Sequence, residues 1–82
     1  MLITAELSYY PLDAHYKPPI RDYIAALHKF NGLEVRTHAL STELFGEYEL
    51  VMQAVQQATK TAFECESGAV LVAKFLNRDR RS

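Results

Sequence analysis

The segment LITAELSYY, residues 2–10, decides how this chain folds, because its apolar and polar side chains alternate. Apolar side chains at positions 3, 5, 7 and 9 are separated by polar ones at positions 4, 6 and 8, which is the period of a half-buried strand. Pro11 lacks a backbone N–H and has a fixed φ, so the strand ends at Tyr10. The sequence therefore predicts a strand with one core face and one polar face, and Glu6 lies in the middle of that polar face.

The residues after this strand predict a helix. Its N-terminus falls near Pro18 or Pro19, where a missing N–H costs least. Apolar residues Ile20, Ile24 and Leu27 then recur at helical spacing, and the dipeptide at 31–32, Asn-Gly, is a strong signal for a helix end.

The second half of the chain repeats this alternation of strand and helix. Residues 33–39 and 41–45 predict two strands of a hairpin, which Gly46 closes. A long apolar stripe from Tyr48 to Ala62 predicts the second helix. Residues 69–76 form a nearly continuous β-rich run, and residues 78–82 a frayed polar tail.

The predicted order of strand, helix, strand, strand, helix and strand is that of a ferredoxin-like α+β sandwich. We expect one domain over residues 1–77, with a four-stranded antiparallel sheet and both helices on one face. Right-handed crossovers place the first and third strands side by side at the centre. The other face stays open. On it we expect Thr4, Glu6, Ser8, Glu34, Arg36, His38, Val70, Val72, Lys74 and Leu76, although the last strand lacks the alternation that would fix its faces.

Composition excludes several classes of protein. The 82 residues carry nine Lys plus Arg against ten Asp plus Glu, which is not the basic footprint of a nucleic-acid-binding protein. The single cysteine, Cys65, excludes an internal disulfide framework and favours a cytoplasmic location. The N-terminal strand contains Glu6 and has no basic flank, so we expect neither a signal peptide nor a membrane span.

Catalytic and metal-binding motifs are weak. The three glycines lie far apart, which excludes a phosphate-binding loop, and the histidines lack metal-ligand spacing, so we expect no metal and no cofactor. Cys65 lies between two glutamates, which disfavour a thiolate. His38 is close in sequence to Ser41 and Thr42, but no third group completes a catalytic arrangement.

Glu6 is the most unusual residue, because it is a charge within a central strand. It either pairs with Arg36 or Lys74 or accepts hydrogen bonds from a ligand amine. The aromatic residues Tyr9, Tyr10 and Phe45 likewise either pack in the core or an interface, or stack on a flat heterocycle.

Four segments together resemble the YkoF-like family of thiamine- and hydroxymethylpyrimidine-binding proteins. They are the opening TAELSYYPL at 4–12, GLEV at 32–35, the hairpin ST at 41–42 with FGE at 45–47, and GAVLV at 68–72 leading to Asn77. The resemblance implies a cytoplasmic ferredoxin-like domain that binds thiamine or its pyrimidine without a catalytic step. It also implies that single domains assemble. The apolar residues expected on the open face lead us to expect a homodimer or homotetramer.

An aminopyrimidine requires a carboxylate or carbonyl acceptor, hydroxyl groups and a flat apolar wall. Around the central strands these groups are supplied by Glu6, Ser8, Tyr10, Ser41 and Thr42, which we predict as the ligand-binding residues. The scarcity of basic residues favours the unphosphorylated vitamin over its diphosphate.

Two other classes of function stay open from the sequence. One is a small dimeric ferredoxin-like enzyme, such as an isomerase or a cofactor-free oxygenase, with Glu6 or His38 as its titratable group. The other is an ACT-like regulatory module that binds an amino acid.

Overall fold

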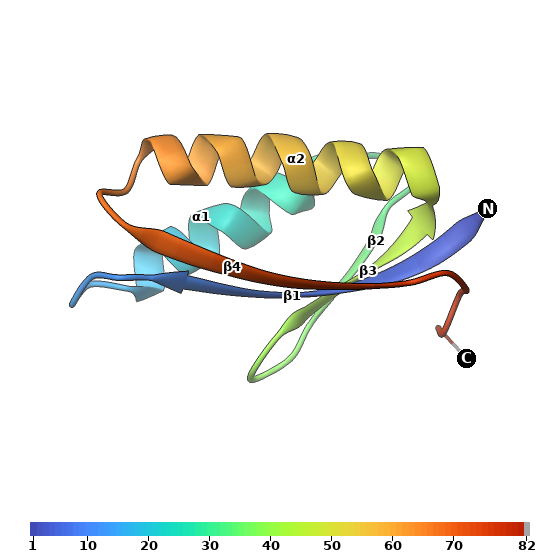
Figure 1. Cartoon of the computed structure of the whole chain (residues 1–82), viewed down its shortest axis with the longest axis horizontal. Coiled ribbons are helices and arrows are strands. Elements are labelled where there is room, and N and C mark those ends of the chain that lie inside the picture. The colour runs from blue at the N-terminus through green and yellow to red at the C-terminus, as the bar shows by residue number, and fades with distance from the viewer. Residues whose placement is uncertain (82) are drawn as a thin grey trace.

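A computed structural model describes residues 1–81 and has the predicted ferredoxin-like order of elements (Figure 1). The elements are β1 (Leu2–Pro11), α1 (Lys17–Leu27), β2 (Glu34–Thr37), β3 (Thr42–Glu47), α2 (Tyr48–Glu64) and β4 (Ala69–Leu76). None of the helices in this range is long and apolar enough to cross a bilayer.

Most element bounds agree with the sequence prediction, and the main difference is the end of α1. The helix ends at Leu27 rather than at Asn31, because the next residues tighten into turns in which Lys29 N–H donates to Ala26 and Phe30 N–H to Leu27. Gly32 follows with a φ of 88°, a backbone conformation that glycine adopts without strain.

The sheet has the strand order β2-β3-β1-β4 with antiparallel neighbours, so β1 and β3 are central, as predicted. Both helices cover one face (Figure 1). The alternation in β1 turns Ile3, Ala5, Leu7 and Tyr9 toward the helices, where all four are buried. Their partners in the core include Leu27, Leu44, Val51, Ala54 and Ala58.

Strand pairing fixes the face of β4 that the sequence left undecided. Tyr10, Ser8, Glu6 and Thr4 of β1 lie opposite Val70, Val72, Lys74 and Leu76, respectively. Because paired residues share a face, these four β4 side chains lie on the open face, as we expected. Phe45 lies opposite Thr4 and is therefore on this face too.

The residues after β4 lie against the open face. The Thr4 hydroxyl donates to the Arg78 carbonyl (2.9 Å) and accepts from the Arg80 N–H (3.0 Å). The Arg81 guanidinium lies 5.8 Å from the centre of the Phe45 ring and forms an ion pair with Asp79. The expected fraying is therefore wrong for residues 78–81, while Ser82 lies outside the described residues.

Candidate functional site

A row of four charged side chains crosses the open face of the sheet. Strand register places Arg36, Glu43, Glu6 and Lys74 side by side on β2, β3, β1 and β4. The two central members are both carboxylates, an arrangement that is unfavourable unless cations lie close by. The Lys74 ammonium is 3.7 Å from the Glu6 carboxylate, and the His38 imidazole lies 2.8 Å from that of Glu43.

The Glu6 carboxylate connects this charged row to the β2–β3 hairpin. It accepts a hydrogen bond from the Ser41 hydroxyl at 3.1 Å. The Ser8 hydroxyl, on the same face of β1, donates to the Leu40 carbonyl at 3.2 Å. These two bonds attach the hairpin turn to the central strand, and the Glu6 side chain remains 43% exposed.

A cavity of about 420 Å³, here called the hairpin cavity, opens beside this attachment. It lies between the hairpin turn, the second half of β1 and α1. Its lining residues are Leu7, Ser8, Tyr9, Tyr10, Tyr16, Ile20, Tyr23, Ile24, Thr37, His38, Ala39, Leu40, Ser41 and Thr42. The volume lies within the range of small-molecule sites.

Four of the five sequence-predicted site residues line the hairpin cavity: Ser8, Tyr10, Ser41 and Thr42. The fifth, Glu6, is joined to it through the Ser41 hydroxyl. The five do not share one face, however. Thr42 lies opposite Leu7 and is 6% exposed, so its side chain is on the helix-facing side, whereas Glu6, Ser8 and Tyr10 are on the open side.

Aromatic residues form much of the wall, and two of them, Tyr16 and Tyr23, were not singled out from the sequence. Tyr9 and Tyr23 stack with their ring centres 4.7 Å apart and an interplanar angle of 19°. Burial raises the pKa of the Tyr23 phenol, whose hydroxyl is 2.9 Å from that of Thr59. Tyr16 precedes α1 in an irregular segment, so no periodicity could place it; the stripe of Ile20 and Ile24 was the only signal for the α1 wall.

The polar groups of the site are engaged in hydrogen bonds with one another. Ser41 donates to Glu6, and the His38 Nε2 atom is engaged with Glu43 instead of with Ser41 or Thr42. Within residues 1–81, no three His, Cys, Asp or Glu side chains gather as a metal site would require. The arrangement can hold a flat polar molecule between hydroxyl groups, a carboxylate and aromatic rings.

Solved structures share this fold. A hypothetical protein from Methanocaldococcus jannascii superposes with a TM-score of 0.84 at 25% identity, over 99% of this chain and 84% of that one. A "domain of unknown function DUF77" from Bacillus cereus matches with a TM-score of 0.81 at 17% identity, covering 96% and 78% of the two chains. A protein from Thermotoga maritima, described as a "putative thiamine biosynthesis/salvage protein", matches with a TM-score of 0.84 at 16% identity, covering 95% and 85%.

No protein-family model matches the sequence, and no curated protein does so either. At these identities the structural matches establish the ferredoxin-like fold, and one structure with that fold carries a thiamine-related description.

Proposed function

We propose that this chain is a non-enzymatic binding protein for thiamine or its hydroxymethylpyrimidine moiety, acting in the supply of the vitamin. The observation that carries the proposal is the gathering of Ser8, Tyr10, Ser41 and Thr42 around one cavity, with the Glu6 carboxylate bonded to Ser41. The thiamine-related description of the Thermotoga maritima protein, which has the same fold, supports the same ligand class.

The chemistry of an aminopyrimidine fits these groups. Its exocyclic amine is a donor that the Glu6 carboxylate can accept, and its ring nitrogens are acceptors for hydroxyl groups. Glu6 and Glu43 are paired on the neighbouring strands β1 and β3. An amine or a thiazolium cation near them therefore relieves the repulsion between the two carboxylates.

Apolar side chains at the mouth of the hairpin cavity also favour a flat ligand. Leu40, Tyr10 and Tyr16 line the cavity and are 88%, 52% and 50% exposed. Large apolar groups that gather around a cavity gain free energy when a flat ligand covers them. We therefore place the ring of the ligand between these side chains and its amine toward Glu6.

The lining residues favour the unphosphorylated ligand. His38 is the only basic side chain among them, and it is already engaged by Glu43. A diphosphate would bring several negative charges close to two carboxylates. We therefore expect thiamine and hydroxymethylpyrimidine to bind more tightly than thiamine diphosphate.

Isothermal titration of the chain with these three compounds tests the proposal. We expect Glu6→Gln to weaken binding about tenfold to a hundredfold, because a hydrogen bond to a charged acceptor is lost. The matched control is Glu43→Gln, the same change of charge one strand away, for which we expect a loss below about threefold.

If both variants lose the same affinity, the effect comes from the total charge of the four-residue row, and Glu6 is not the direct hydrogen-bond acceptor of the ligand. Absence of heat from all three compounds, with a folded protein, would overturn the proposed function. Mass spectrometry of the recovered ligand checks the non-enzymatic part: chemical conversion of the ligand would favour an enzyme.

We also propose that the chain assembles into a homodimer or homotetramer. β4 is at the edge of the sheet, and its open-face residues Val70, Val72 and Leu76 are 45%, 46% and 40% exposed. A second copy that covers them adds apolar burial to a small core. Light scattering at micromolar concentration measures the mass directly, and a monomer would contradict this proposal.

A further inference from the structure

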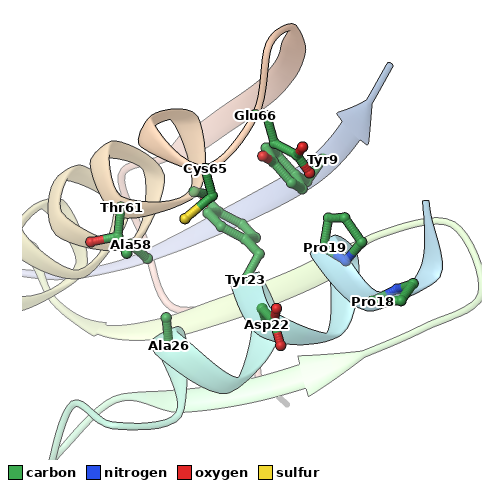
Figure 2. Close-up of a pocket in the computed structure, with 11 residues that line it drawn as sticks. Tyr9, Pro18, Pro19, Asp22, Tyr23, Ala26, Ala58, Thr61, Cys65 and Glu66 are labelled. Atoms are coloured by element: carbon green, nitrogen blue, oxygen red, sulfur yellow. The ribbon is translucent and has the colours of Figure 1, made fainter. Parts of the chain in front are cut away.

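A second cavity, here called the helix cavity, lies between the two helices (Figure 2). Its volume is about 290 Å³. One side of α1 and the second half of α2 form its sides, and β1 contributes Tyr9. Its lining residues are Tyr9, Pro18, Pro19, Asp22, Tyr23, Ala26, Ala58, Thr61, Ala62, Cys65 and Glu66.

Small side chains keep this space open. Ala26 of α1 and Ala58 and Ala62 of α2 line it, so the helices have no large apolar side chain at these positions to fill the gap. The stacked pair of Tyr9 and Tyr23 adds aromatic groups to the wall. The cavity is therefore bounded by small side chains of both helices and by two tyrosines.

The Tyr9 hydroxyl is the feature that points to a ligand. It is the one buried side-chain polar atom within residues 1–81 that lacks a hydrogen-bond partner, on a residue that is 8% exposed. A buried polar group without a partner is costly and calls for an explanation. Figure 2 shows the Tyr9 side chain beside Glu66, which lines the cavity together with Cys65. Burial, followed by Glu66 and Cys65, raises the pKa of this phenol.

The charge of the cavity is negative. Asp22 on α1 and Glu66 after α2 contribute carboxylates, and Figure 2 shows Glu66 beside Tyr9. The lining residues include no Lys, Arg or His. A cation in this space gains from both carboxylates, whereas an anion is repelled.

We propose that the helix cavity is a second ligand site, for a small planar organic cation such as an aromatic amidinium or a protonated amino-heterocycle. The ring lies against the Tyr9–Tyr23 pair. The N–H groups of the cation reach the Glu66 carboxylate and donate to the Tyr9 hydroxyl oxygen, which gives that buried atom its missing partner. This site does not depend on the function proposed for the hairpin cavity, although the same tyrosine pair lines both cavities.

Amide chemical-shift titration of the whole chain tests the proposal with three probes of nearly equal shape. Benzamidinium is the cation, benzamide the neutral analogue and benzoate the anion. We expect benzamidinium to bind with a dissociation constant of about 1 mM, typical of a small ligand, and to shift residues around Ala58, Thr61 and Ala62. Benzamide is expected to bind at least about fivefold more weakly, and benzoate not at all.

Two variants link binding to the cavity. Glu66→Gln removes one carboxylate and is expected to weaken benzamidinium binding about fivefold or more, while Ala62→Leu fills the space and is expected to abolish binding. Glu64→Gln is the matched control, since it makes the same change of charge two residues away, outside the residues that line this cavity. We expect it to change affinity less than about twofold.

The proposal is overturned if benzamide or benzoate binds as tightly as benzamidinium, or if Glu64→Gln weakens binding as much as Glu66→Gln. It is also overturned if the shifts lie around Ser8, Leu40 and Ser41, because the probe then occupies the hairpin cavity. Because Glu66→Gln leaves the packing of the helices intact, it keeps the test decisive if Ala62→Leu does not fold.

Discussion

The two ends of the open sheet face are built differently, although the same strands form both. At the end where β1 begins, Thr4 is 9% exposed and Phe45 only 1%, because residues 78–81 lie across them. At the end where β1 finishes, Tyr10 and Val70, which pair with each other, are 52% and 45% exposed. We call these the covered end and the uncovered end.

The chain therefore stabilises one end of the face with its own residues and leaves apolar and hydroxyl groups accessible at the other. The covered end has satisfied polar groups, since both hydrogen-bonding roles of the Thr4 hydroxyl are used. The uncovered end adjoins the hairpin cavity, which Tyr10 and Ser8 line. We therefore expect substitutions at the covered end to change stability, and those near the cavity to change binding.

The largest expected effect is that of Phe45→Ala. Removing this buried ring leaves a cavity under Arg36 and Arg81 and should lower the free energy of unfolding by about 3 to 5 kcal/mol. Urea denaturation measures it. Val72→Ala is the comparison at a half-exposed position on the same face, with an expected loss below about 1 kcal/mol; equal losses would remove the distinction between the two ends.

A chain that ends at Asn77 tests whether residues 78–81 are the cause of the difference. The truncation removes both partners of the Thr4 hydroxyl and uncovers Phe45, so we expect it to lower the free energy of unfolding by about 1 to 3 kcal/mol. Affinity in the hairpin cavity should change less than about twofold. A truncated chain with unchanged stability would show that these residues rest on the sheet without stabilising it.

At the uncovered end, Ser41→Ala should separate binding from stability. The substitution removes the hydrogen bond between the hairpin turn and Glu6, which should weaken hydroxymethylpyrimidine binding about fivefold by titration calorimetry. The loss in free energy of unfolding should stay below about 1 kcal/mol, since Glu6 is partly exposed and water can replace the hydroxyl. A larger change in stability than in affinity would contradict a role for Ser41 in the site.

The smallest expected effect is a pH dependence of the stability that the C-terminal residues give to the covered end. The Arg36 guanidinium, followed by that of Arg81, lowers the pKa of Glu34, and Arg81 lowers that of Asp79. Lowered folded pKa values mean that this stabilisation is complete above the ordinary values of 4.5 and 3.8 and is lost as the pH falls through the folded values.

We therefore expect the stability difference between the full chain and the chain ending at Asn77 to shrink from about pH 6 to about pH 3. Urea unfolding of both chains across this range measures it. A difference that grows toward acid would mean that the ion pairs of Asp79 and Glu34 do not hold the C-terminal residues in place.

The sequence predicted the fold because the alternation in β1 is unambiguous. With residues 3, 5, 7 and 9 toward the helices, the order of the elements predicts both the helix-covered face and the two central strands, as observed. The face of β4 was expected correctly, but apolar residues lie on both of its sides, so only the pairing with β1 fixes it. The position of residues 78–81 could not be predicted, because it depends on hydrogen bonds to a single threonine far away in sequence.

The candidate site was predictable in its residue types and less so in its geometry. Glu6, Ser8 and Tyr10 share a face because strand period fixes them, and the bond between Ser41 and Glu6 brings the hairpin to the same place. Thr42 is the first residue of β3 and lies opposite Leu7, so its side chain is on the helix-facing side, which the prediction overlooked. Tyr16 belongs to a segment without periodicity, so only the folded chain reveals its place in the cavity wall.

The stacked pair of Tyr9 and Tyr23 gives the protein an optical reporter of its own. The chain has five tyrosines and no tryptophan, so tyrosine emission is not masked or drained by energy transfer to an indole. Two of the five rings form the partition between the hairpin and helix cavities. A molecule that enters either cavity therefore meets the same pair of fluorophores, and the ultraviolet emission of the unlabelled chain should register its arrival.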